Sequence, residues 1–232
     1  MSEGPPGVPE RGEQARRVAR ARPRYGRYGY ILLFLILALL AVNTLLSKPN
    51  GARGIDPGQR VPPFAVPLAQ GKLTGDADTA VRAGEGARVA ACAERGAQIL
   101  NICQLYERGP VVLALFVDAG SCPRVLDDLQ ALRPSFPGVQ FAGVALRADR
   151  GHLRRLAAEK GLTFPLGLDR SGKLLVLYRM ASCPQVTFIY PGGVVQSPAL
   201  LERVSRPELR AHVAALVAAA RARGWRAPGR AG

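Results

Sequence analysis

The chain alternates between short apolar runs and segments in which apolar residues recur every three or four positions. The run 111–117, Val-Val-Leu-Ala-Leu-Phe-Val, is continuous and has the length of a central strand buried on both faces of a sheet. Further strands are predicted at 140–146 and 186–190, with shorter extended segments at 64–68, 99–102 and 164–167. Helical spacing predicts amphipathic helices at 123–132, 150–161 and 207–223, and a short helix at 172–180.

The order of these segments indicates the fold class. A strand, a helix and a second strand follow one another first. Pro191-Gly192-Gly193 then separates 186–190 from 194–196, a turn typical of a hairpin. With the terminal helix, this order predicts an α/β fold with a mixed central sheet flanked by helices on both sides. The domain is expected to span 64–225, and 226–232 is expected to be a tail.

A different pattern precedes this domain. Residues 28–47 carry no charge, and a helix of about 20 residues spans roughly 30 Å, the thickness of a bilayer's hydrocarbon core. The stretch predicts one transmembrane helix that anchors the chain. A cleaved signal peptide is a second interpretation, although 43–48 lacks the small residues of a cleavage site. A buried core helix is the third. Residues 48–63, rich in proline and glycine, are expected to be a linker.

Charge indicates how the anchor is oriented. The 232 residues carry 32 lysines and arginines against 17 acids, a net charge of +15. Seven arginines and three glutamates lie in 1–27, predicting a disordered basic tail in the cytoplasm and a domain outside it. The sequence shows no zinc-finger spacing, RNA-binding aromatic motif or basic heptad, so nucleic acid is not an expected partner. The expected location is the cell membrane, with a single pass.

Two cysteines stand at the ends of predicted strands. Cys122 follows the strand 111–117 and starts a helical segment, where the helix dipole favours the reactive thiolate. Cys183 directly precedes Pro184 and the strand 186–190. The chain has four cysteines, which allow three complete pairings.

These segments resemble a known superfamily. Residues 120–132, Gly-Ser-Cys-Pro-Arg-Val-Leu-Asp-Asp-Leu-Gln-Ala-Leu, resemble the Cys-Pro-x-Cys-x-x-x-Leu-x-x-Leu segment of two groups. These are the extracytoplasmic thioredoxin-like proteins and the redoxins (peroxiredoxin-like, AhpC/TSA-type). Residues 183–188 are similar to the cis-proline segment of these proteins, and 191–193 to the turn that follows it. The resemblance covers roughly 60–225 and implies a thioredoxin-like fold.

The resemblance assigns roles to individual residues. Cys122 is the attacking cysteine, and Pro184 is the cis-proline beside the active site. Val125 occupies the usual resolving position, so the resolving role falls to Cys183, whose position lies near the attacking sulfur in this fold. A Cys122–Cys183 bridge requires Cα atoms within about 7 Å. The favoured pairing then joins Cys92 to Cys103 as a structural disulfide, as expected in an oxidising compartment.

Other polar residues near Cys122 have two interpretations each. Asp118 could assist proton transfer or be a polar residue at a strand end. Ser121 and Arg124 could supply hydrogen-bond donors. Ala119 stands where a peroxiredoxin has the threonine of its Thr-x-x-Cys motif, which weakens a peroxidase assignment. The sequence has no metal-ligand spacing around its two histidines and no haem-attachment motif, so no metal or cofactor is expected.

Three functions are consistent with these features. The leading one, which makes the chain an enzyme, is a membrane-anchored extracytoplasmic thiol-disulfide oxidoreductase with Cys122 as nucleophile and Cys183 as resolving partner. Its expected partners are protein or small-molecule thiols and disulfides. The second is a non-catalytic binding module in which both disulfides are structural. The third is a redoxin-type antioxidant peroxidase. The oligomeric state is not predicted.

Overall fold

The computed structural model describes residues 26–46, 53–82 and 89–228. The chain divides into two compact units, 1–50 and 51–232. Most of the predicted basic tail 1–27, residues 48–52 of the predicted linker and 229–232 of the predicted C-terminal tail lie outside the described residues.

The first unit contains helix α2 (Gly26–Leu46). Its described side chains are almost all apolar and exposed, from Tyr28 to Val42. Within 26–46, 53–82 and 89–228, no helix is long and apolar enough to span a membrane. The predicted span 28–47 also includes Ser47, which is not among these residues.

The second unit follows the predicted alternation of strands and helices. Its strands are β1 (Ala65–Pro67), β2 (Ile99–Asn101), β3 (Val111–Val117), β4 (Gln140–Leu146), β5 (Leu166–Asp169) and β6 (Gln185–Ile189). Its α-helices are α3 (Ile102–Arg108), α4 (Val125–Leu132), α5 (Arg150–Glu159), α6 (Lys173–Leu177) and α7 (Arg206–Ala222). The described residues of this unit also include three single 3₁₀ turns: η2 (Ala91–Ala93), η3 (Cys122–Arg124) and η4 (Arg133–Ser135).

The central sheet is mixed, as predicted. Its strand order is β5-β4-β3-β6, with β3, β4 and β5 parallel and β6 antiparallel to β3. Val111 pairs with Gln140 of β4 on one side and with Ile189 of β6 on the other. β1 and β2 form a separate antiparallel pair.

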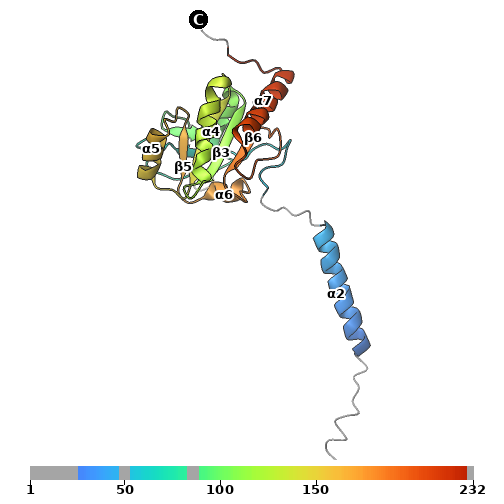
Figure 1. Ribbon diagram of the computed structural model, residues 1–232. Helices are drawn as coiled ribbons and strands as arrows, with labels where there is room; N and C mark the ends of the chain where they lie inside the picture. The colour runs from blue at the N-terminus through green and yellow to red at the C-terminus, as the bar shows by residue number, and fades with distance from the viewer. Residues whose placement is uncertain (1–25, 47–52, 83–88, 229–232) are drawn as a thin grey trace, which may run out of the picture. The chain divides into compact units, whose positions relative to one another are not determined.

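Alternate residues of the sheet enter two separate cores, because successive strand side chains point to opposite faces. Phe116 and its even-numbered neighbours in β3 pack with α4, α5 and α7, and we call this side the α4 face. Leu115 and its odd-numbered neighbours pack with α3 and α6. Figure 1 shows α4 in front of β3, with α5 and α7 to either side of it. Helices therefore cover both faces of the sheet.

Side-chain caps define where three of the helices begin. Asn101 accepts hydrogen bonds from the backbone N–H of Cys103 and Gln104 at the start of α3, and Asp149 accepts one from the N–H of His152 in α5. Ser205 accepts from the N–H of Glu208, and Pro207 occupies the first turn of α7. Each cap satisfies an N–H group that has no partner within its helix.

Two boundaries differ from the prediction. Ile55 and Val61 are buried in the core beneath α3 and α6, so part of the predicted linker 48–63 belongs to the folded unit. The predicted hairpin strand 194–196 does not form a regular strand. Its backbone hydrogen bonds go to two different segments: Gln196 N–H donates to the carbonyl of Phe188 in β6, and Val195 N–H donates to the carbonyl of Gln59. Proline and glycine in 53–63 conceal this packing from a pattern-based prediction.

Candidate active site

The structure joins Cys122 to Cys183 in a disulfide, with the two Cα atoms 5.5 Å apart. Cys122 is the first residue of η3, which leads directly into α4. Cys183 lies two residues before β6 begins. Both cysteines are half-buried and pack against the core of the α4 face. Two elements far apart in the sequence thus bring the pair together at one edge of the domain.

Strand β3 positions both cysteines. Its last residue pair with β6 is Leu115 and Gln185, so Val117 lies opposite Cys183 in the continued register. The backbone N–H of Val117 donates to Sγ of Cys183 at 3.3 Å. Beyond Val117 the chain turns through Gly120, whose φ of +57° favours glycine, and enters η3 at Cys122. The strand end is therefore the common support of the site.

The residues around Pro184 complete this support. The Cys183–Pro184 peptide bond is cis, and Pro184 is buried. Val125, at the position where the related motif has its second cysteine, is 2% exposed and packs into the core. Position 125 therefore holds an apolar side chain of the core instead of a thiol, and Cys183 is the cysteine that is bonded to Cys122.

An acid and an imidazole form a pair at the end of β3, the strand that supports both cysteines. Asp118 follows β3 directly, and its Oδ2 lies 3.1 Å from Nε2 of His152 in the first turn of α5. The side chain of Asp118 is 19% exposed and that of His152 is 49% exposed. His152 has no role predicted from the sequence, because nothing in the local pattern indicates that α5 brings it against Asp118.

Ser121 and Arg124 lie beside Cys122 at the surface. Both are exposed, and in the described part of the chain neither side chain makes a hydrogen bond or ion pair. Their backbones form the turn of η3, where Arg124 N–H donates to the Ser121 carbonyl at 3.1 Å. Their side chains are free to meet a partner that approaches the cysteine pair.

The second disulfide joins Cys92 to Cys103, with Cα atoms 5.4 Å apart. It connects η2 to α3, and Cys103 is 1% exposed. The side-chain amide of Asn101 donates to the carbonyls of Ala91 and Glu94, at 2.7 and 2.8 Å. Arg95 forms a two-pronged ion pair with Glu107 of α3. We call η2, α3 and these contacts the stapled corner.

Acidic groups with shifted pKa values gather around Asp78 and Lys173. Burial, a hydrogen bond with Asp78 and the charge of Asp78 raise the pKa of Glu94 above its ordinary value. Burial would raise the pKa of Asp76, but hydrogen bonds from Ser171 and Ala77 and the charge of Lys173 lower it to about 2. In the residues that the structure describes, no three His, Cys, Asp or Glu side chains converge to hold a metal ion.

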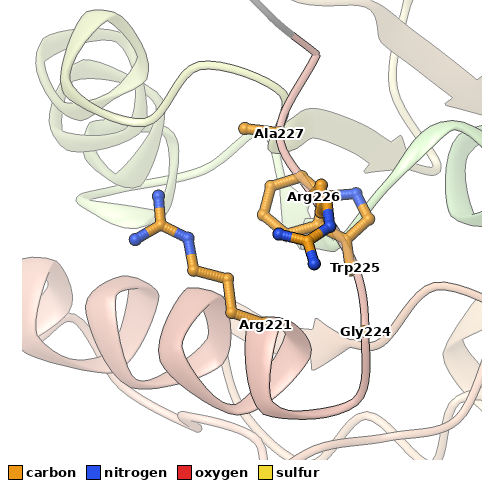
Figure 2. Close-up of a pocket in the computed structure, with 5 residues that line it drawn as sticks. All are labelled: Arg221, Gly224, Trp225, Arg226 and Ala227. Carbon is orange, nitrogen blue, oxygen red and sulfur yellow. The ribbon is translucent and has the colours of Figure 1, made fainter.

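A hollow of about 380 Å³ lies at the end of α7, away from the residues discussed so far. Figure 2 shows the residues that line it, with Arg221 on the helix and Trp225 and Arg226 on the segment that follows. Trp225 packs against the core and against Gly138, where a Cβ atom would lie 3.1 Å from the indole. None of the predicted site residues lines this hollow.

Comparison with known proteins places the fold. No protein-family model matches the sequence, and no curated protein matches it as a relative. Among solved structures, a protein from Chlorobium tepidum assigned as thiol:disulfide interchange protein DsbE is similar, with a TM-score of 0.52 and 18% identity. The likeness covers 72% of this chain and 98% of that one. The fold is thioredoxin-like.

Two further neighbours agree with this assignment. A protein from Bacteroides thetaiotaomicron assigned as a protein disulfide isomerase has a TM-score of 0.51 and 16% identity, covering 72% of this chain and 94% of that one. Peroxidoxin BcpB from Mycobacterium tuberculosis has a TM-score of 0.51 and 15% identity, covering 72% and 97%. The thioredoxin-like domain thus has thiol-disulfide oxidoreductases among its neighbours.

Proposed function

We propose that the chain is a thiol-disulfide oxidoreductase whose reactive pair is Cys122 and Cys183. The observation that carries the proposal is their meeting from separate elements, with Cα atoms 5.5 Å apart and both residues half-buried. A sulfur that starts a helical segment and remains accessible is suited to thiolate chemistry. The solved thiol-disulfide oxidoreductases with the same fold support the assignment.

The exchange proceeds in two displacements. The Cys122 thiolate attacks one sulfur of a substrate disulfide; a Cys122–substrate S–S bond forms and the first substrate thiolate leaves. The Cys183 thiolate then attacks Sγ of Cys122, closing the Cys122–Cys183 bond and releasing the second substrate thiolate. Two electrons pass from the cysteine pair to the substrate, and the two thiol protons end on the substrate thiols. The reverse sequence oxidises a dithiol.

The surrounding residues support particular steps of this exchange. The N–H of Val117, which donates to Sγ of Cys183, stabilises negative charge on that sulfur when the bond opens. In this proposal Asp118 takes up or returns a proton, and its pairing with the half-exposed His152 supports a path to solvent. Pro184 closes the site beside Cys183. Exposed Ser121 and Arg124 offer donors to the partner.

We also propose that the uncharged stretch 28–47 anchors the chain in a membrane and that the thioredoxin-like domain lies outside the cytoplasm. Its support is the uncharged stretch 28–47 behind seven arginines in 1–27. An oxidising compartment is also where two disulfides persist. Carbonate extraction of membranes tests the anchor, and labelling of reduced Cys122 in intact cells with an impermeant maleimide tests the side. Release by carbonate contradicts the anchor; absence of labelling contradicts the orientation.

The experiment for the reaction measures two quantities on the full-length chain. The first is the reduction potential of the Cys122–Cys183 pair, expected between about −120 and −230 mV for a working oxidoreductase. The second is the rate of insulin reduction, compared with Cys122→Ser. A potential below about −300 mV together with equal rates would make the domain a binding module with two structural disulfides. Cys122-dependent consumption of hydrogen peroxide, without insulin reduction, would indicate the peroxidase instead.

A further inference from the structure

Residues 200–206, which we call the strap, lie against the segment that carries Cys183. Val186 and Leu200 exchange two backbone hydrogen bonds, at 2.8 and 2.9 Å. On the other side of Cys183, the hydroxyl of Ser182 donates to the carbonyl of Leu201. The strap is thus hydrogen-bonded to residues on both sides of Cys183.

The same strap is held by the helix that follows Cys122. Asp128 of α4 is 1% exposed, and each of its carboxylate oxygens accepts one guanidinium hydrogen bond. Nε of Arg203 lies 2.9 Å from Oδ2, and Nε of Arg206 lies 3.1 Å from Oδ1. One buried carboxylate therefore joins α4 to Arg203 and Arg206 of the strap.

This connection matters because the two cysteines do not share an element. In a Cys-x-x-Cys motif one helical turn carries both thiols, so the backbone itself keeps them close when they are reduced. Here they are 61 residues apart in sequence. The loop 118–121 joins Cys122 to β3, while Cys183 lies two residues before β6 begins, so no single helical turn sets the spacing of the two thiols.

We propose that Asp128 is a positioning residue for the Cys122–Cys183 pair. Through Arg203 and Arg206 it ties α4 to the strap and holds Cys122 within reach of Cys183 when the disulfide is open. Because the pair must close again in each cycle, this proposal rests on the proposed oxidoreductase function. Correct placement of two reacting groups raises their effective concentration, and small misplacements lower it steeply.

The helix provides its own control. Asp127, the preceding residue, pairs at 2.7 Å with Lys160, which directly follows α5, and α5 carries no cysteine. Asp127→Asn and Asp128→Asn remove the same charge from adjacent positions of one helix. Only the second loosens the link between the two cysteine-bearing elements.

The test follows closure of the pair in the full-length chain. The protein is reduced, Cys122 is converted to its mixed disulfide with glutathione, and the rate of Cys122–Cys183 formation is followed by mass spectrometry of the two cysteine peptides. We expect closure to slow about tenfold in Asp128→Asn and less than about twofold in Asp127→Asn. The equilibrium constant against glutathione is expected to fall by the same factor as the rate.

Other measurements separate positioning from neighbouring explanations. Alkylation of Cys183 by iodoacetamide in a Cys122→Ser background reports the reactivity of the attacking thiol, and a tenfold change there that matches the closure rate overturns positioning. A lowered Tm with unchanged closure in the folded protein overturns it too. If Asp128→Asn does not fold, Arg203→Lys keeps the charge but removes the Nε donor, and unchanged closure in this variant contradicts the proposal. If closure slows in Asp128→Asn as expected but the wild-type chain does not reduce insulin, only the proposed function is rejected.

Discussion

The two disulfides of this domain have nearly the same span, with Cα atoms 5.5 and 5.4 Å apart, and very different surroundings. Cys122–Cys183 joins the start of η3 to the segment that leads into β6, 61 residues later in the sequence. Both of its cysteines are accessible. Cys92–Cys103 closes 11 residues, and Cys103 is almost fully buried. The Cα–Cα distance therefore does not distinguish the proposed reactive pair from the proposed structural one.

What distinguishes them is the set of polar groups that each can use. Cys183 receives an N–H from Val117, and Asp118 with His152 lies at the same strand end. At the stapled corner, Asn101, Arg95 and Glu107 are occupied in holding η2 to α3. Polar groups at the first site remain available for a reaction, whereas those at the second are committed to the fold.

The largest expected effect separates the two bridges by activity. Cys122→Ser removes the attacking sulfur, so we expect insulin reduction to fall to the background rate. Cys92→Ala with Cys103→Ala leaves the reactive pair intact and should retain most of the activity. Turbidity assays at a temperature where all variants are folded measure both. Equal losses in the two variants would contradict the division between a reactive bridge and a structural one.

Stability should depend on both bridges, because the entropy that a disulfide removes from the unfolded chain grows with the length of the loop that it closes. Removing a bridge that closes so short a loop is expected to lower the free energy of unfolding by about 2–3 kcal/mol, through the entropy of the unfolded chain. The Cys92→Ala, Cys103→Ala variant therefore should unfold at lower urea concentration than the wild type. The comparison variant carries Cys122→Ala and Cys183→Ala. Its loss of unfolding free energy measures the same entropic contribution for the longer loop. An unchanged midpoint in the first variant would show that the corner holds without its staple.

Sequence patterns predicted the strands of the sheet better than the contacts between elements. β3 and β4 match the predicted 111–117 and 140–146 to the residue, because alternation on two buried faces leaves an unambiguous apolar run. Asp128 with Arg203 could not be predicted in the same way. The two residues are 75 positions apart, and their pairing depends on how the strap packs against α4.

The same limit applies at the site itself. The placement of Cys122 before a helix follows from local sequence, and Cys183 was brought to it only by resemblance to a known fold. His152 had no local signal, because its partner lies on another element. Residues whose role comes from tertiary packing alone are those that pattern analysis missed.

A smaller effect should distinguish the two sites by their acid–base groups. Asp118→Asn removes the carboxylate that can exchange a proton at the reactive pair, and we expect the rate of insulin reduction to fall by up to about 10²-fold. His152→Gln should cause a smaller loss, because the acid remains. His212→Gln is the matched control, since that imidazole stacks on Phe188. A loss in the His212 variant as large as that in the His152 variant would argue against a specific Asp118–His152 role.

The smallest effect concerns pH and the stapled corner. The pKa of Glu94 is raised in the folded protein by burial and by Asp78, so the folded state binds that proton more tightly than the unfolded state does. This contribution to stability is complete below the ordinary pKa of a glutamate and is lost as the pH rises through the higher folded pKa. Asp78→Asn should bring the pKa of Glu94 closer to its ordinary value and flatten this part of the stability profile. Urea unfolding midpoints measured from about pH 4 to pH 7 test it.

The rate of insulin reduction, corrected for wild-type pH dependence, should not change in this variant, because Glu94 and Asp78 lie near the staple rather than near Cys122. A change in rate without a change in the stability profile would mean that the two regions are coupled and that the staple is more than a support.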